Sequence, residues 1–353
     1  MAHGLVYRAA LRAAVMALVL QALVLQTGAA AAAEDFYKGK TIRVVAGTAA
    51  GSGGYDAQGR VLIRHLPKHI PGNPLFVFQN MPAAGGMVAI NHVYNVSERD
   101  GTEIGLFNRA TLFAPLLNEP AAKYKVEDFN WLGTPASYND NAFFFFIRAA
   151  LPYRTMDDLR RADPPINVGN VSGIVIRALP ESLGVKMKLI TGYTGPELDL
   201  ALQRGELDGL GSSLSNLRNQ SPHWIADGFI RLLAQFSRAT RHPDFPDVPL
   251  GRELVANPDD RALMELSEMP LTLGYPFAAP PGVPAERVAI LRAAFAAAMN
   301  DPDYKADLAK AKLEYSPKSG ERMQAEIAGI GRLPATVVDR FRKLSAEEPG
   351  SRR

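Results

Sequence analysis

The chain has 353 residues, a hydrophobic content of 47%, no cysteine and a formal net charge of +3. Without cysteine it can form neither a disulfide scaffold nor a cysteine-linked lipid anchor. The basic residues are scattered along the chain, which argues against a nucleic-acid partner and against a membrane-binding stripe.

The N-terminus has the pattern of a secretory signal. Arg8 and Arg12 precede an apolar run at 13–25, and small residues at 31–33 suit signal peptidase. We therefore expect residues 1–33 to be removed, which leaves 37 basic and 36 acidic residues, and we expect the mature protein to be free in the periplasm. The remaining 320 residues exceed what one hydrophobic core usually holds, so two domains are expected.

A strand, a glycine-rich loop and a helix follow in that order. Residues 42–46 form the predicted buried strand, 48–54 a loop of small residues, and Asp56 leads the helical run. Free amides and the positive end of the helix dipole favour an anion at such a place, either a carboxylate or a phosphate. The glycines do not have the G-x-G-x-x-G spacing of a dinucleotide site.

A second loop of the same kind follows the predicted strand 75–79. Residues 82–86 are Pro, Ala, Ala, Gly and Gly, which leave the backbone almost bare of side chains. The loop can therefore bring backbone amides close to a ligand. A buried strand that ends in a tight turn is the alternative interpretation.

The rest of the chain continues an α/β pattern. A strand is predicted at 104–107, and a second block has strands at 143–147, 166–168, 187–190 and 230–236 and helices at 156–161, 174–183 and 196–204. The four phenylalanines at 143–146 indicate a strand buried on both faces, although one ring could line a cleft. The helix 286–300 is amphipathic, with Val288, Leu291, Phe295 and Met299 on its buried side.

The residues that resemble catalytic or metal-binding motifs mostly lack a part that the motif requires. Gly39, Lys40 and Thr41 resemble the end of a P-loop, but Glu34 stands where that motif needs glycine. His65 and His69 have the spacing of a helical metal pair, but a proline separates them, so we expect no metal site. The remaining histidines at 92, 223 and 242 have no evident acidic partner close in sequence, and distant partners stay open.

Short motifs along the chain occur in the order that one protein family has. They are Asp56 and Arg60 after the first loop; Asn80, Pro82, Ala84 and Gly86 in the second; Asp100, Gly101 and Thr102; Gly169, Asn170 and Ser172; Tyr193, Thr194 and Gly195; Gly205 and Asp208; and Ala279, Pro280, Gly282, Pro284, Glu286 and Arg287. Together they resemble the receptors of tripartite tricarboxylate transporters, the Bug or TctC-like family of extracytoplasmic solute-binding proteins. Ala83 departs from the family pattern, where glycine is usual, and the Asp100 segment is one residue short.

The resemblance implies an α/β periplasmic binding protein of type II, with two Rossmann-like lobes, a two-strand hinge and a central ligand cleft. Lobe I would comprise residues 34–140 and 240–353, and lobe II residues 141–239. The strands at 143–147 and 230–236 would cross between the lobes.

The resemblance also implies a receptor that is not an enzyme and needs no cofactor. As a monomer it would close over a small organic carboxylate and present it to membrane permease subunits. The expected ligand-binding residues are Thr48, Ala49, Gly51, Ser52, Gly53, Tyr55, Asp56, Asn80, Ala84, Gly85, Gly86, Asn170, Val171, Ser172, Gly173, Tyr193, Thr194 and Asp208. Asp56 is expected to order its loop, because a second carboxylate would repel an anionic ligand, and Tyr55 either narrows the pocket or packs over the loop.

Two other functions stay open at this point. The protein could present its ligand to a membrane sensor kinase, or it could be an enzyme on the same scaffold, in which case Tyr138, Asp140 or Ser172 would be the reactive groups. The ligand is equally open, because amide loops recognise a carboxylate and little else of the molecule. A dicarboxylate, a tricarboxylate, an aromatic acid and an amino acid all fit.

Overall fold

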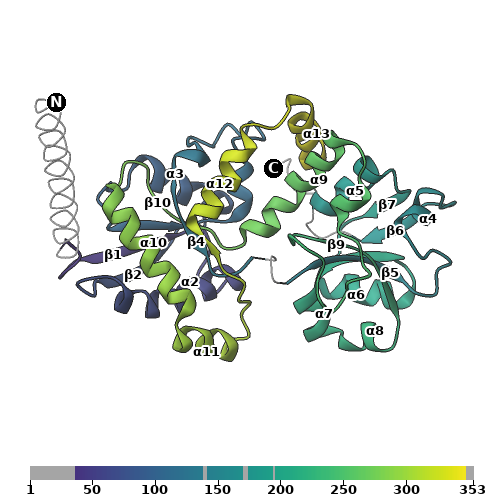
Figure 1. The fold of residues 1–353 in the computed structure, drawn as a ribbon, viewed down its shortest axis with the longest axis horizontal. Coiled ribbons are helices and arrows are strands. Elements are labelled where there is room, and N and C mark those ends of the chain that lie inside the picture. The colour runs from purple at the N-terminus through teal and green to yellow at the C-terminus, as the bar shows by residue number, and fades with distance from the viewer. Residues whose placement is uncertain (1–35, 138–140, 170–173, 194, 347–353) are drawn as a thin grey trace, which may run out of the picture.

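The computed structural model describes residues 36–137, 141–169, 174–193 and 195–346. The expected signal segment 1–33 lies outside this part of the chain. The described helices and strands form two β-sheets flanked by helices, which Figure 1 shows side by side. The predicted α/β fold is thus confirmed. None of the described helices is both long and apolar enough to cross a bilayer.

The first sheet has six strands in the order β11-β4-β10-β3-β1-β2. Their bounds are Thr41–Ala46 (β1), Leu75–Asn80 (β2), Glu103–Leu106 (β3), Asn130–Thr134 (β4), Phe277–Ala279 (β10) and Lys318–Ser319 (β11). β1 runs parallel to both β2 and β3, so the carboxyl ends of these three strands meet at one edge. β10 is antiparallel to its neighbours on both sides.

Helices cover both faces of the first sheet, because the apolar side chains along a strand point alternately to one face and to the other. Val44 packs in one core with α2 and α10, and Val45 in the other core with α3 and α12. The helices are Gly54–His65 (α2), Met87–Asn95 (α3), Ala285–Asn300 (α10), Pro302–Lys310 (α11), Gly320–Ile330 (α12) and Ala335–Ala346 (α13). The predicted buried side of α10 is confirmed, since all four of its named side chains are buried.

The second sheet has five strands in the order β7-β6-β8-β5-β9. The strands are Phe143–Arg148 (β5), Ile166–Gly169 (β6), Met187–Ile190 (β7), Gly209–Ser213 (β8) and Ile230–Phe236 (β9); the helices are Met156–Arg160 (α4), Ile174–Leu183 (α5), Gly195–Arg204 (α6), Leu214–Gln220 (α7) and Pro222–Ala226 (α8). Phe145 packs in the core on one face of β5, and Phe144 and Phe146 pack in the core on the other. The prediction of a strand buried on both faces is therefore confirmed.

The crossing between the sheets differs from the expectation. β5 and β9 pair with each other inside the second sheet, so the chain crosses in the segments before β5 and after β9. Strands between 41 and 134 and between 277 and 319 build the first sheet, and those between 143 and 236 build the second. The proposed lobe boundaries stay a prediction.

One helix belongs to both cores. In α9, Pro258–Leu273, Leu263 packs with the core of the first sheet and Met264 with that of the second. α9 lies next to α5 of the second sheet (Figure 1). The two sheets are therefore joined by a packed helix as well as by the crossing segments.

Candidate functional site

Three loops meet where the parallel strands β1, β2 and β3 end. The Gly47 amide donates to the Leu106 carbonyl over 2.9 Å, and the Met81 amide donates to the Ala46 carbonyl over 2.8 Å. The loops that follow the strands are therefore neighbours. The predicted residues at this edge are Thr48, Ala49, Gly51, Ser52, Gly53, Tyr55, Asp56, Asn80, Ala84, Gly85 and Gly86.

Asp56, in the first turn of α2, holds the first two loops together. Its carboxylate accepts hydrogen bonds from the Gly51 amide (2.9 Å), the Arg60 guanidinium (2.8 Å) and the Asn80 side-chain amide (2.9 Å). Asn80 also donates to the Thr48 carbonyl over 2.9 Å. The carboxylate is thus turned into the loop, where it acts as a fixed acceptor.

These contacts also determine the charge of Asp56. Burial alone would raise the pKa of its carboxyl, but the hydrogen bonds from Arg60, Asn80 and the Gly51 amide outweigh that effect and hold the pKa below its usual range. Asp56 is therefore ionised at neutral pH and stays paired with Arg60.

The amides of the first loop divide into two groups. Those of Gly51, Ser52 and Gly53 donate within the loop. Those at 48–50 have no acceptor among the described residues, and both Ala49 and Ala50 are exposed. The first turn of the twelve-residue helix α2 also has no side-chain cap. A ligand anion at this edge would thus meet unused N–H donors and the positive end of a helix.

The second loop is a short 3₁₀ segment, Ala83–Gly86. Ala84, Gly85 and Gly86 have φ values of 50°, 63° and 93°, in the region that favours glycine. A Cβ added to Gly85 would meet nothing within 4 Å, whereas one added to Gly86 would lie 2.5 Å from the Gly47 carbonyl oxygen. Gly85 faces open space, and Gly86 packs against the first loop.

Tyr55 packs over the loops. Its ring meets the Tyr275 ring edge to face at 4.8 Å between centroids, and its hydroxyl donates to the Gly274 carbonyl (3.4 Å) and accepts from the Arg109 amide (3.1 Å). Burial raises the pKa of this phenol, so it stays neutral. Tyr55 therefore ties the loop after β3 to the first loop.

Three residues at this edge escaped the sequence analysis. Arg109 follows β3, and its neighbour Asn108 donates to the Gly85 carbonyl over 3.4 Å. The predicted end of the strand 104–107, parallel to its neighbours, was the signal that could have found them. Tyr275 comes from a distant part of the chain and gave no local signal.

The second half of the predicted site is only partly described. Asn170, Val171, Ser172, Gly173 and Thr194 lie outside the described residues, as do Tyr138 and Asp140. Tyr193 is half buried beside the core under β5. The Asp208 carboxylate accepts from Arg148 (3.1 Å) and from the Asn167 amide (2.8 Å), so it links β5 to β6. The ligand roles of these residues remain predictions.

A side chain that follows α11 reaches a helix beside the second sheet. Glu314 follows α11, and its carboxylate accepts hydrogen bonds from Ser215 of α7 and from Asn141, the latter over 3.0 Å. The Glu314 carbonyl accepts from Gln58 of α2 over 2.7 Å. The helix that starts at the first loop is thereby connected to the second sheet.

The histidines of α2 and the following turn pair with an acid within α11 and with the acid that caps it. His65 Nε2 lies 3.0 Å from Asp307, and His69 Nε2 lies 3.0 Å from Asp301. Among the described residues no group of three or more His, Asp or Glu side chains is arranged to hold a metal ion. His92 lies 3.0 Å from Glu103.

The expectation that His242 has no acid near it in sequence is wrong. Its Nδ1 atom lies 3.9 Å from the carboxylate of Asp244, two residues further on, and accepts the Asp244 amide over 3.1 Å. The contact is part of a turn.

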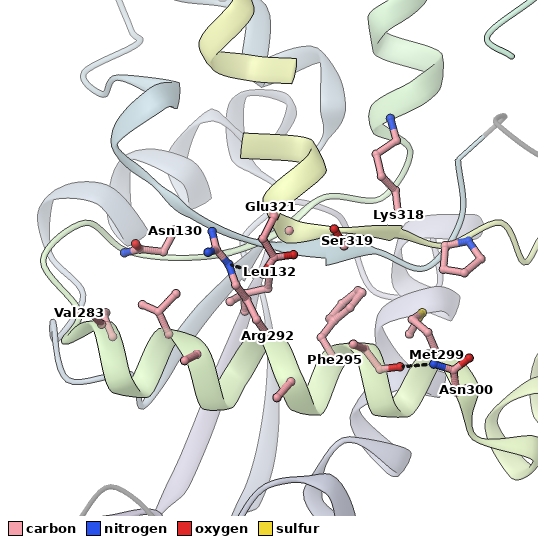
Figure 2. A pocket seen from close by; sticks show the side chains of 17 residues that line it. Asn130, Leu132, Val283, Arg292, Phe295, Met299, Asn300, Lys318, Ser319 and Glu321 are labelled. Carbon is pink, nitrogen blue, oxygen red and sulfur yellow. Dashed lines mark hydrogen bonds and ion pairs between the residues drawn. The ribbon is translucent and has the colours of Figure 1, made fainter. Parts of the chain in front are cut away.

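Two cavities lie away from the three loops. The larger, about 690 Å³, lies between α10 and the strands β4 and β11 (Figure 2). Arg292 crosses it and donates to the Trp131 carbonyl over 2.8 Å. The smaller, about 350 Å³, lies between α9 and α12. No predicted ligand-binding residue lines either cavity.

Known proteins share this sequence pattern and this fold. A model of the tripartite tricarboxylate transporter family receptor matches residues 60–329. The chain is 27% identical over 343 residues to the UPF0065 protein in the gbd 5′ region of Cupriavidus necator, which covers 92% of this chain and 96% of that protein.

Two solved structures share the fold. A TctC solute binding protein from Polaromonas superposes with a TM-score of 0.67 at 22% identity, covering 88% of this chain and 100% of that one. MatC from Rhodopseudomonas palustris, solved with bound malate, superposes with a TM-score of 0.51 at 18% identity, covering 86% of this chain and 98% of that one.

Proposed function

Because this chain belongs to the family of tripartite tricarboxylate transporter receptors and is a solute-binding receptor, we propose that it captures a small organic carboxylate in the periplasm and delivers it to membrane permease subunits. The carboxylate would lie on the loops after β1, β2 and β3. A loop from the second lobe, at 170–173, would close over it, as the family resemblance implies.

The set of unused backbone donors in the first loop supports this proposal most directly. The amides at 48–50 have no acceptor among the described residues, and α2 begins beside them without a side-chain cap. The Asp56 carboxylate fixes the loop by accepting the Gly51 amide, and Arg60 balances its charge. Preorganised neutral donors of this kind suit a carboxylate, because removing water from an amide costs less free energy than removing it from a charged basic side chain.

The bound malate in MatC supports the ligand class. That protein shares the fold of this chain, and malate carries two carboxylates. The amide loops described above can hold one of them, and the remainder of the solute would be recognised by groups on the second lobe.

A thermal-shift screen tests the proposal. The purified protein is unfolded and refolded to remove any bound solute, then heated with mono-, di- and tricarboxylates and with uncharged and phosphorylated compounds. A ligand at roughly 100 times its dissociation constant adds about 2.7 kcal/mol of stability, enough for a shift of several degrees. We expect a shift with at least one carboxylate. Shifts only with uncharged or phosphorylated compounds would contradict the ligand class.

A matched variant locates the binding event. Gly85→Val adds a side chain in the open space beside the second loop. It should therefore abolish the rise in melting temperature that the carboxylate causes. Val77→Ala, on the exposed edge of β2, should leave the shift unchanged. An unchanged shift in Gly85→Val would place the solute elsewhere.

A further inference from the structure

The chain leaves the first sheet through residues 135–137, which pair with a segment that follows α11. The Ser316 amide donates to the Pro135 carbonyl over 3.2 Å, and the Ser137 amide donates to the Ser316 carbonyl over 2.8 Å. The Ser137 hydroxyl donates to the same carbonyl over 3.0 Å, and both serines are buried. The two segments are therefore fixed to each other at the point where the chain begins to cross to the second sheet.

Glu314, two residues before Ser316, reaches beyond this pairing to the second sheet. Its carboxylate accepts hydrogen bonds from the Asn141 side-chain amide over 3.0 Å and from the Ser215 hydroxyl. Asn141 also donates to the Ser215 hydroxyl over 3.0 Å, so the three side chains form a closed hydrogen-bonded set. We call Glu314, Asn141 and Ser215 the Glu314 latch. It connects the segment after α11 to the far side of the crossing.

The latch lies at the edge of the second sheet where the predicted ligand loop begins. Asn141 comes just before β5, and Ser215 is in α7, which directly follows β8. β8 runs antiparallel to β5 and parallel to β6. The start of β5, the end of β8 and the end of β6 therefore share one edge, and the predicted ligand loop follows the end of β6.

The backbone of Glu314 is held by the helix that begins at the first loop. Gln58 of α2 is only 1% exposed, and its side-chain amide donates to the Glu314 carbonyl over 2.7 Å. Gln58 lies about one helical turn after Gly54, the first residue of α2. Glu314 thus contacts the helix beside the proposed solute with its carbonyl and the edge of the second sheet with its carboxylate.

We propose that Glu314 is a positioning residue for the capture of a carboxylate, an inference that rests on the proposed function. The Glu314 latch holds the edge of the second sheet beside α2, so both sides of the solute site are in place before the solute arrives. Without the latch, fewer molecules have this arrangement, and the measured affinity falls in proportion. The latch needs an acceptor oxygen and no charge, because both of its donors are neutral.

Distances between the two sheets in the absence of any solute test the latch. Because the chain has no cysteine, Ala297→Cys on α10 and Gln203→Cys on α6 let spin labels be attached at these two exposed positions alone. Pulsed electron paramagnetic resonance then gives the distribution of distances between the labels. We expect a narrow distribution for the labelled protein and a wider one when Glu314→Ala or Ser215→Ala is added.

Further variants separate the latch from other causes. Glu314→Gln keeps the acceptor oxygen, so it should retain the narrow distribution. Glu314→Ala and Ser215→Ala remove two sides of one contact, so the double variant should be no wider than Glu314→Ala alone. Lys312→Ala, which removes an exposed side chain from the same segment, should change nothing.

Calorimetric titration with malate connects the latch to the proposed function. Where malate binds the unchanged protein, Glu314→Ala should weaken binding at least about tenfold, the typical effect of losing a hydrogen bond to a charged group. Glu314→Gln should restore most of the affinity. Failure of malate to bind the unchanged protein would count against the proposed function for this solute, and the distances measured without solute would still decide on the latch.

Melting curves check that each variant is folded. The proposal is wrong if Glu314→Ala gives the same distance distribution as Lys312→Ala. It is equally wrong if malate binds Glu314→Ala as tightly as it binds the unchanged protein.

Discussion

The backbone of Gly86 lies against the backbone of Gly47, so that a Cβ on Gly86 would stand 2.5 Å from the Gly47 carbonyl oxygen. The loops after β1 and β2 therefore touch without any side chain between them. Gly85, one residue earlier, has nothing within 4 Å of the same position. Adjacent glycines thus have different roles, one in packing and one at the open face.

This difference predicts unequal effects of the same substitution. Gly86→Val should lower the free energy of unfolding by about 2–5 kcal/mol, because backbone must move and the φ of this residue is also positive. Gly85→Val should lower it by only about 1–2 kcal/mol, the cost of a positive φ, yet abolish carboxylate binding. Urea unfolding and a solute titration on both variants measure the two effects. Equal losses of stability and binding in Gly85→Val would favour a purely structural turn.

Removing the carboxylate of Asp56 should loosen the first loop. Asp56→Ala leaves the Gly51 amide and the Arg60 guanidinium without their acceptor, so we expect a loss of about 1–3 kcal/mol. Asp56→Asn, which keeps one acceptor oxygen, should lose less.

The effect of Asp56 should depend on pH. Since the folded protein holds the pKa of Asp56 below its usual range, the contribution is complete above about pH 4 and is lost as the pH falls through the lower, folded value. Urea unfolding at about pH 7 and about pH 3 should show the unchanged protein and Asp56→Ala converging in acid. A constant difference would contradict the ion pair.

Asp301 should stabilise the contact between α11 and α2. It caps α11 by accepting the Asp303 amide over 3.0 Å and pairs with Lys68 (2.6 Å) and His69 (3.0 Å). Asp301→Ala should cost about 1–2 kcal/mol, the typical effect of losing a cap.

Asp301→Asn separates the cap from the charge, because asparagine still caps a helix. Lys68 and His69 hold the pKa of Asp301 well below its usual range. The advantage of aspartate over asparagine should therefore be present at neutral pH and fade in strong acid. Thermal unfolding across that range measures it, and an unchanged gap between the two proteins would show that the pairs contribute nothing.

The phenylalanine-rich strand should be the most sensitive part of the second sheet. Phe146 is fully buried and meets the Trp224 ring at 6.2 Å. Phe146→Ala should cost about 3–5 kcal/mol through the cavity that it leaves. Leu75→Ala is the matched control, because Leu75 is 72% exposed, and it should change stability by less than about 0.5 kcal/mol. A small loss for Phe146→Ala would mean that the core collapses around the gap.

Several elements of the fold were predictable because their own residues encode them, whereas the long helix α9 was not predicted. The strand at 42–46 and the helix at 286–300 were each found to within one residue, since their apolar side chains follow the period of a strand or a helix. β10 and β11 were not predicted. They have three and two residues, too few for a period, and become strands only through pairing, β10 with β3 and β4 and β11 with β4.

In the site, too, local features were predictable and long-range contacts were not. The sequence indicated that Asp56 orders its loop, because a second carboxylate would repel an anionic ligand. It could not indicate that Tyr275 covers Gly54, a contact between residues more than 200 positions apart. Long-range contacts of this kind depend on the assembled sheet and leave no local pattern.

The position of β10 sets the order in which the molecule can assemble. β10 lies between β3 and β4, but its residues come after every strand of the second sheet. The two strands that pair with β4 are β10 and β11, and both are synthesised after residue 276. β4 therefore has no partner strand at a stage when the second sheet can already be complete. A nascent chain shorter than this cannot close the first sheet, so β1, β2 and β3 stay without the strands that complete their sheet until residues 277–319 have been made.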